Sequence, residues 1–298
     1  MLSGDKIEKF IEERLGIRDW AEQLEKSKLE FLTVLYRRYR LVMYFENTFM
    51  GTNPPEEQRG PKMSDVVYRA TETAGGVCMH LNFFMNILLT HLGYNVHPIG
   101  AKCLSLDLPN NHIFLLVRFS NPGEAGNTDK YLVDVGFPWP ISGPINLQQL
   151  PYEYNAGGFK IRYEFNEELS VYERVLTGGD PINREYDDKN EEKVDMRFDL
   201  EPRKFEDFGD TMEVIFGDAD RSFFLNTTLM FRYVTLEDEN NYEYICCMGR
   251  KIIFGSAMRR EIQTYETYVE MAPDILKHFP QLKPDVVLKA CELFDSKH

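Results

Sequence analysis

Residues 73–92 read TAGGVCMHLNFFMNILLTHL, and this stretch organises the chain around one helix. A glycine pair, Gly75-Gly76, directly precedes Val77 and Cys78, and Gly93 follows at the position where glycine commonly ends a helix. Apolar residues recur at the spacing of a single helix face, at Val77, Leu81, Phe84, Met85, Leu88 and Leu92. The pattern therefore predicts an amphipathic helix whose first turn contains Cys78.

Cys78 is a candidate nucleophile because of this position. Unpaired backbone N–H groups and the helix dipole stabilise negative charge at the start of a helix, which favours a thiolate. The two glycines permit a sharp approach to the helix and leave room for a substrate near the sulfur. The alternative interpretation, a cysteine that only packs in the core, stays open on local grounds.

Two further residues complete the parts of an acyl-transfer site. His112 opens an apolar strand, and Asp134 lies inside a second apolar stretch at 131–137. A carboxylate with such neighbours is expected to be buried and to need a histidine or arginine partner. If that partner is His112, Asp134 fixes the imidazole tautomer, His112 takes the thiol proton, and Cys78 attacks an acyl carbonyl.

The turn between these two strands leaves the Asp–His contact open. If the loop spans 120–129, Phe119 faces Lys130 and the strict partner of His112 is Phe137. Asp134 then lies three residues from the position that faces His112. A longer or asymmetric loop, or a bulge, would bring the two side chains together.

The rest of the chain divides into three expected parts. Helical spacing prevails before Gly16, again over 24–39 and in the helix at Cys78, and a loop at 51–61 separates the last two. Later segments have strand spacing, at 95–99, 112–119, 131–137, 159–165, 171–176, 223–235, 242–248, 251–254 and 264–271. A charged run at 183–193 marks a boundary, and a closing helix opens at Pro284. We therefore expect an α+β chain, with a helical bundle over 1–93, an antiparallel β-barrel-like domain over 94–192 and an α/β part over 193–298.

Composition excludes several classes of function. The 298 residues are 43% hydrophobic and 13% aromatic, which supports a large core, and the net charge is −14. This charge argues against nucleic acid or an anionic membrane as the main partner. Five cysteines without a framework, and an N-terminus without an apolar stretch, predict a reduced, cytoplasmic protein. Cys78 and His80 form C-x-H without a second ligand pair, so we expect no metal.

Several segments, taken in order, resemble the arylamine N-acetyltransferase family. They are residues 45–47 (FEN), 75–82 (GGVCMHLN), 111–112 (NH), 133–137 (VDVGF) and 203–208 (RKFEDF). The resemblance extends over about residues 5–260. These segments are similar to the family's pattern, which has an active-site helix with a cysteine, a histidine before an apolar strand, and a V-D-x-G-F block.

The resemblance implies a role for each of the three polar residues. Cys78 would accept the acetyl group, His112 would be the general base, and Asp134 would orient it. It further implies ping-pong transfer from acetyl-coenzyme A to an arylamine or hydrazine, as in xenobiotic metabolism. The implied fold is a helical bundle, a β-barrel-like domain and an α/β lid around a cysteine-protease-like Cys-His-Asp core. Three residues match positions near the family's pocket: Phe45, Val77 and Phe137.

The sequence also departs from the family pattern. Ala74 stands where the family has an arginine before the glycine pair. Asp218 and Asp220 would face a polyanionic coenzyme unless Arg221 and Lys204 offset them, so no coenzyme A contact is assigned. Three alternatives therefore stay open: an amide synthase that uses the same triad and a carrier-bound acyl chain, a non-enzymatic binding protein, and a thiol hydrolase.

Overall fold

The computed structural model describes residues 2–53, 58–119, 128–178 and 191–297. Its helices are α1 Gly4–Lys9 with the π-helical turn η1 Phe10–Arg14, α2 Trp20–Lys26, α3 Lys28–Val42, α4 Thr48–Thr52, α5 Met63–Glu72, α6 Cys78–His91, α7 Gly209–Gly217, α8 Tyr268–His278 and α9 Pro284–Asp295. Two 3-10 turns are η3 Phe205–Phe208 and η4 Phe223–Leu225. The strands are β1 Tyr44–Phe45, β2 Gly75–Gly76, β3 Asn95–Cys103, β4 His112–Phe119, β5 Asp129–Val133, β6 Ile145–Asn146, β7 Tyr152–Ala156, β8 Phe159–Asn166, β9 Val171–Thr177, β10 Glu192–Pro202, β11 Leu229–Leu236, β12 Tyr242–Met248, β13 Lys251–Ser256 and β14 Arg260–Thr264.

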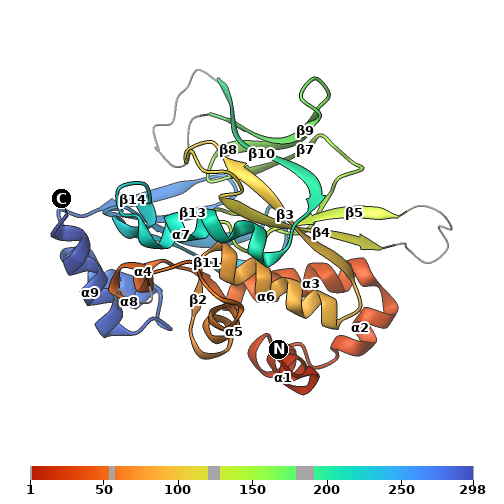
Figure 1. Ribbon diagram of the computed structural model, residues 1–298, viewed down its shortest axis with the longest axis horizontal. Helices are drawn as coiled ribbons and strands as arrows, with labels where there is room; N and C mark the ends of the chain where they lie inside the picture. Colours follow the sequence, from red (N-terminus) through yellow and green to blue (C-terminus); the bar gives the residue numbers. More distant parts are fainter. Residues whose placement is uncertain (1, 54–57, 120–127, 179–190, 298) are drawn as a thin grey trace.

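Helix α6 lies at the centre of the molecule. It packs against α5 on one side and against β3 and β4 on another (Figure 1). Ten of its residues are buried, which is more than one helix face, because protein surrounds it on several sides. The predicted amphipathic helix is therefore confirmed as an element, and it is a core helix rather than a surface one.

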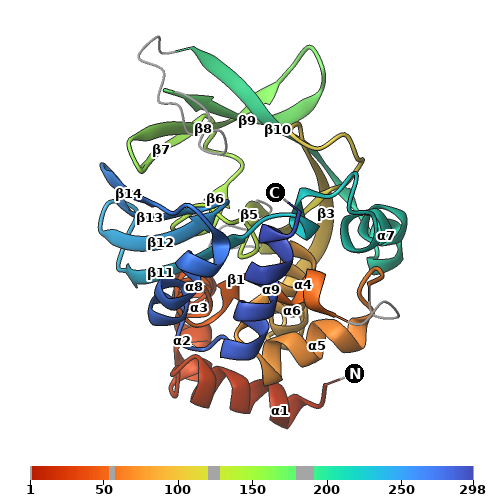
Figure 2. The same ribbon diagram turned by 90° about the vertical axis from the view of Figure 1, so that its left-hand side faces the viewer.

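One antiparallel sheet forms the barrel-like part of the fold. Among the described residues its eight strands follow the order β6-β5-β4-β3-β10-β9-β8-β7. Strand β10 pairs with β3 on one side and with β9 on the other, so a late segment joins two halves of the sheet. Figure 2 shows β7 to β10 arching away from β11 to β14. The predicted mixed α+β fold with a barrel-like antiparallel sheet is confirmed.

A second sheet joins the start of α6 to the C-terminal part of the chain. Its order over the described residues is β14-β13-β12-β11-β1-β2. The glycine pair itself is strand β2, which pairs in parallel with β1, and β1 pairs in turn with β11. Helices α8 and α9 cover one face of this sheet through a separate apolar cluster that includes Met230, Cys247, Ile275 and Val287 (Figure 2).

Several predicted elements are wrong in position or type. The predicted 24–39 helix is divided at Ser27, whose hydroxyl accepts a hydrogen bond from the Glu30 amide and starts α3 anew. The predicted strand at 264–271 is wrong, because Thr267 caps the start of α8 by accepting from the Glu270 amide. The predicted strand at 223–235 begins instead as the 3-10 turn η4.

The sequence patterns missed β7 and β10. In β10, Met196 and Phe198 are buried while most other residues are exposed or half-buried, so charged residues disguise the alternation. The expected boundary at 192/193 falls at the beginning of β10, and residues 183–190 of the charged run lie outside the described residues. The predicted turn at 120–127 also lies outside them. No helix of the described part is both long and apolar enough to cross a membrane.

Candidate active site

Cys78 is the first residue of α6, and its side chain is 4% exposed. The two glycines before it are required because neighbouring protein atoms leave no room for a side chain at either position. Gly75 has a φ of 149°, and a Cβ there would lie 2.0 Å from the carbonyl oxygen of Tyr44. A Cβ on Gly76 would lie 2.9 Å from the ring of His80. The pair therefore permits the sharp approach that the sequence predicts, and protein atoms fill the space that was expected to admit a substrate.

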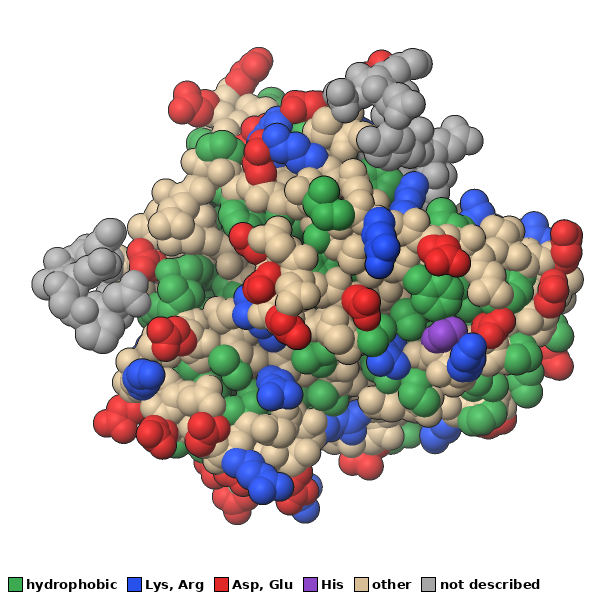
Figure 3. Space-filling view, turned by 180° about the vertical axis from the view of Figure 1, so that it is seen from behind, with side chains coloured by type: hydrophobic (Ala, Val, Ile, Leu, Met, Phe, Trp, Pro, Cys, Tyr) green, Lys and Arg blue, Asp and Glu red, His purple; other side chains and the backbone are tan. Residues whose placement is uncertain are grey.

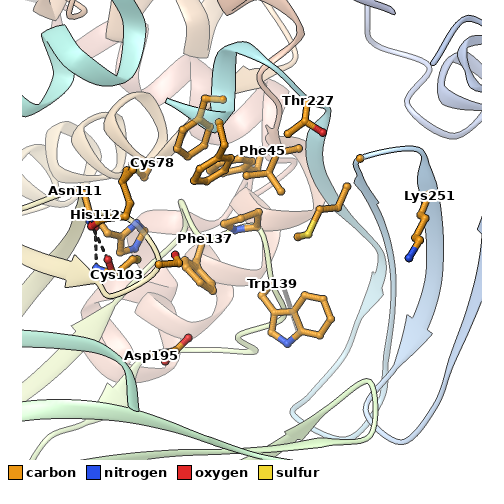
Figure 4. Close-up of a pocket in the computed structure, with 18 of the residues that line it drawn as sticks. Phe45, Cys78, Cys103, Asn111, His112, Phe137, Trp139, Asp195, Thr227 and Lys251 are labelled. Atoms are coloured by element: carbon orange, nitrogen blue, oxygen red, sulfur yellow. Dashed lines mark hydrogen bonds between the residues drawn. The ribbon is translucent and has the colours of Figure 1, made fainter. Parts of the chain in front are cut away.

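His112 and Asp134 form a buried hydrogen-bonded pair. The Nε2 atom of His112 lies 2.7 Å from Oδ2 of Asp134, and the two residues are 3% and 2% exposed. This contact leaves Nδ1 as the ring nitrogen available to the Cys78 thiol (Figure 4). The structure thus brings together the three polar residues that the sequence singled out.

The hairpin register that joins the pair differs by one residue from the expected one. Phe119 pairs with Asp129 rather than with Lys130. Side chains alternate between the two faces of a sheet, so a one-residue shift moves a strand's side chains to the other face. The observed register places Asp134 on the face that carries His112, whereas the expected register would have placed it on the opposite face.

Asp134 is held by a set of backbone and side-chain donors. Its Oδ1 accepts a hydrogen bond of 3.0 Å from the Asn82 amide and one of 2.9 Å from the backbone N–H of Gly136. Asn82 also donates to the carbonyl of Ile113 and accepts from the N–H of Val135, so α6 is tied to both strands. A Cβ on Gly136 would lie 2.7 Å from the Cα of Cys78, so glycine is required for this close approach.

The buried charges raise the proton affinity of the histidine. Burial alone would lower the pKa of the His112 imidazole, but the Asp134 carboxylate and a hydrogen bond with the Cys78 thiol raise it to about 9. Burial would likewise raise the pKa of Asp134, but the charge and hydrogen bond of His112 lower it overall. His112 is therefore protonated near neutral pH, and an imidazolium beside a thiol favours the thiolate.

A buried arginine fixes the segment that follows Asp134. Arg40 of α3 is 1% exposed and donates to the carbonyls of Val135, Phe137 and Trp139 at 3.0 Å each. Its guanidinium carbon also lies 4.7 Å from the ring centre of Phe231. These bonds hold residues 135–139 in place after β5 ends.

A second arginine is hydrogen-bonded to the glycine pair. The Arg69 guanidinium of α5 donates to the carbonyl of Gly75 at 2.7 Å and forms a salt bridge with the buried Glu46 carboxylate. It also lies over the ring of Phe49 at 3.6 Å. Ala74, which replaces the arginine of the family pattern, is buried. A guanidinium is thus present at the glycine pair although it comes from another position.

Cys78 and His112 open onto a cavity of about 620 Å³, a size typical of small-molecule sites. Its walls are largely apolar, and Figure 4 shows Phe45, Phe137 and Trp139 around the sulfur and the imidazole. The further lining residues are Cys103, Ser105, Leu106, Asn111, Pro138, Arg174, Asp195, Phe223, Phe224, Thr227, Leu229, Met248, Gly249, Arg250, Lys251, Thr264, Tyr265 and Tyr268.

The predicted pocket residues occupy different places. Phe45 and Phe137 line the cavity, and the ring of Phe137 lies 5.2 Å from that of His112 at 78°. Val77 is buried at the N-cap of α6 and is not among the described residues that line the cavity. Asp134 lies behind His112 rather than in the cavity wall.

Sequence reasoning assigned no role to Asn82, Arg40, Arg69 or Arg174. For two of them a signal exists. Arg40 lies one residue after Tyr39 of the apolar stripe of α3, and Asn82 lies four residues after Cys78, on the same face of α6. A polar residue on an otherwise apolar face predicts a buried hydrogen-bonding role.

Asp218 and Asp220, in the segment 217–223, are not among the described residues that line the cavity, and the Asp218 carboxylate stabilises a turn. Oδ1 of Asp218 accepts hydrogen bonds from the N–H groups of Asp220 and Arg221 at 3.0 and 3.2 Å. Phe223 and Phe224, further along the segment, line the cavity. On the face seen in Figure 3, acidic and basic side chains are interspersed rather than gathered by sign. No group of three or more metal-ligating side chains occurs within the described ranges.

Comparisons with known proteins show the family to which the chain belongs. A family model described as N-acetyltransferase matches residues 28–240, more than half of the chain. Arylamine N-acetyltransferase 1 of Felis catus is 26% identical over 199 residues, which are 61% of this chain and 72% of that protein. Proansamycin X synthase of Amycolatopsis mediterranei (strain S699) is 37% identical over 75 residues, which are 23% of this chain and 25% of that protein.

Among solved structures, the arylamine N-acetyltransferase of Mycobacterium marinum in complex with CoA has the same fold. The TM-score is 0.69, with 17% sequence identity, over 90% of this chain and 93% of that chain.

Proposed function

Because the chain belongs to the arylamine N-acetyltransferase family of acyltransferases, we propose that it transfers an acetyl group from acetyl-coenzyme A to an arylamine or hydrazine. The observation that carries the proposal is the buried pair of His112 and Asp134, 2.7 Å apart, beside Cys78 at the N-terminus of α6. The apolar cavity in front of the sulfur has the size and lining expected for an aromatic acceptor.

In the first half-reaction, the Cys78 thiolate attacks the acetyl carbonyl carbon. A bond forms between Sγ and this carbon, and the bond between the carbon and the coenzyme A sulfur breaks. The His112 imidazolium, which holds the proton taken from Cys78, gives it to the departing coenzyme A thiolate. Asp134 keeps the imidazole in the tautomer that presents Nδ1 to the sulfur throughout.

In the second half-reaction, the amine nitrogen attacks the Cys78 thioester. The neutral His112 accepts a proton from the nitrogen as the new C–N bond forms, and the C–S bond to Cys78 breaks. The products are the acetamide and the original pair of thiolate and imidazolium. His112 therefore donates a proton in the first half-reaction and accepts one in the second. The bond between the Cys78 sulfur and the acetyl carbon forms in the first and breaks in the second.

The cavity also has a suitable end for the donor. Arg250, between β12 and β13, and Lys251, the first residue of β13, line it, and Lys251 lies on the side away from Asp195 (Figure 4). Two cations there suit the phosphates of coenzyme A. The carboxylates of Asp218 and Asp220, which had argued against this donor, lie outside the lining residues among those described.

The direct test is intact-protein mass spectrometry after incubation with acetyl-coenzyme A alone. We expect a mass increase of one acetyl group, absent in Cys78→Ala and removed by adding an arylamine. An unchanged mass with acetyl-coenzyme A would overturn the proposal. The partial match to a protein named as a synthase supports an amide synthase as the second candidate. Labelling by a carrier-protein thioester, with none from coenzyme A thioesters, would select it.

A further inference from the structure

Arg174 of β9 places a guanidinium in the wall of this apolar cavity. The residue is 2% exposed, and its guanidinium carbon lies 4.0 Å from the ring centre of Phe137. The ring of Phe137 is in turn in edge contact with His112. Arg174 is thus separated from the proposed general base by a single aromatic ring.

The hydrogen bonds of Arg174 leave one donor unused. Nε donates to Oδ1 of Asp195 at 2.9 Å, and Nη2 bonds to the other oxygen of the same carboxylate. Nη1 is buried and has no hydrogen-bond partner among the described residues. A buried donor without an acceptor is unfavourable, so a group of this kind at a cavity wall is suited to a ligand atom.

We infer that Nη1 of Arg174 selects the acceptor amine by donating a hydrogen bond to an oxygen at the end of the acceptor opposite the reacting nitrogen. This inference rests on the proposed acetyl transfer. An arylamine whose nitrogen lies at the Cys78 thioester presents its para substituent one ring away from His112. In the structure one aromatic ring, that of Phe137, likewise lies between His112 and Arg174. Arg174 is therefore a contact for substrate specificity and takes no part in proton transfer.

The oxygen that fits is a neutral one. Asp195 occupies two donors of the guanidinium and also lines the cavity, so a carboxylate on the acceptor would lie close to another carboxylate in a poorly solvated space. An ether or amide oxygen accepts the same hydrogen bond without that repulsion. The preferred acceptors are therefore arylamines with an uncharged oxygen para to the nitrogen.

The pantetheine amides of coenzyme A also carry neutral oxygens, so acetyl-coenzyme A is a competing source of the oxygen that bonds to Nη1. The acceptor is favoured because Lys251, one of the two cations that suit acetyl-coenzyme A, lies at another side of the cavity from Asp195 (Figure 4). The Michaelis constant for acetyl-coenzyme A separates the two. If Arg174 contacts the acceptor, this constant changes little when Arg174 is replaced.

The test compares 4-methoxyaniline with 4-ethylaniline, which have nearly the same shape and differ in that an ether oxygen replaces a methylene group. The readout is the ratio of their second-order rate constants with the acetylated enzyme, so differences in amine reactivity cancel between variants. In the double variant Arg174→Met, Asp195→Asn, which leaves no buried unpaired charge, we expect the ratio to fall by about tenfold. An unchanged ratio would overturn the inference, as would an equal rise in the Michaelis constant for acetyl-coenzyme A.

The chain offers a matched control in Arg197 and Glu173. These residues join the same two strands, with Nε of Arg197 2.7 Å from the carboxylate, and are not among the described residues that line the cavity. We expect Arg197→Met, Glu173→Gln to keep the native ratio. Tyr163→Phe should also keep it, because the buried Tyr163 hydroxyl interacts with Arg174 but is not among the described residues that line the cavity. A lost preference in either control would overturn the inference.

Two further measurements keep the outcome interpretable. Isothermal titration calorimetry of both anilines with the unacetylated protein tests the Arg174 contact even if no acetyl-enzyme forms, so failure of the inference and failure of the proposed function are distinguishable. If the double variant does not fold, as judged by circular dichroism, Arg174→Lys replaces it. Lysine retains the charge opposite Asp195 and removes Nη1, so the ratio should fall here too, and an unchanged ratio contradicts the inference.

Discussion

Two buried pairs of a cation and a carboxylate lie at the same cavity and differ in how completely they are satisfied. In the pair of His112 and Asp134, both carboxylate oxygens are bonded, one to the imidazole and the other to Asn82 and Gly136. In the pair of Arg174 and Asp195, one guanidinium nitrogen has no partner among the described residues. A closed pair maintains one geometry, as catalysis requires, whereas an open pair has a donor left for a ligand.

The largest predicted difference between the two pairs is the effect of neutralising each carboxylate in turn. Asp134→Asn should slow acetylation of Cys78 by about 10³-fold or more, because an amide no longer fixes the tautomer or stabilises the imidazolium. Asp195→Asn should slow it by about tenfold or less, since Phe137 separates that pair from His112. Single-turnover acetylation, followed by mass spectrometry, measures both. Equal losses would show that the two pairs act as one unit.

The sequence predicts the positions of Cys78 and His112 better than it predicts the contact between His112 and Asp134. Cys78 is found at the start of a helix because apolar residues at helical spacing begin there. His112 opens β4, as the apolar run over 112–119 predicts. The register between the strands was not predictable, because the sequence does not show at which residues β4 ends and β5 begins, and a one-residue difference decides whether Asp134 faces His112.

The open pair could not have been found in the same way. Alternation along β9 places Arg174 on the face of the buried Leu176 and Glu173 on the face of the buried Val175, so alternation does not distinguish the two charges. Asp195, the partner of Arg174, lies on β10, which the sequence does not predict as a strand. Without that strand no carboxylate is available opposite Arg174, and neither the pair nor its unused nitrogen can be derived.

The support beneath Cys78 offers a second test, of stability rather than of chemistry. Arg69→Met should lower the free energy of unfolding by about 3–5 kcal/mol, because the buried Glu46 carboxylate loses its partner. Adding Glu46→Gln should restore part of this loss, since the buried charge is then removed. Chemical denaturation measures each value.

The matched control for Arg69 is Arg59, which pairs with Asp65 at 2.9 Å on a partly exposed surface. Arg59→Met should lower the free energy of unfolding by less than about 1 kcal/mol. A similar loss in both variants would mean that the buried pair of Arg69 and Glu46 stabilises the fold no more than an exposed pair does. Arg69 would then not take the place of the arginine that the family has at position 74.

A third test concerns the pH dependence that the closed pair gives to stability. The pKa of His112 is raised to about 9, whereas in the unfolded chain it is close to 6.5. The folded state therefore binds this proton more tightly, and the resulting stabilisation is fully present below about pH 6.5 and lost as the pH rises through about 9. Asp134, whose pKa is lowered, contributes in the opposite sense at acid pH, outside this window.

Denaturation at several pH values between 6 and 9 isolates the histidine. Relative to His112→Gln, Asp134→Asn, in which neither group titrates, the native protein should lose stability on the order of a few kcal/mol across this range. Cys78→Ala should retain most of the loss, because Asp134 contributes more than Cys78 to the raised pKa of His112. If native protein and double variant changed in parallel, the imidazolium would not be the stable form of His112, and the first proton would have to reach coenzyme A from elsewhere.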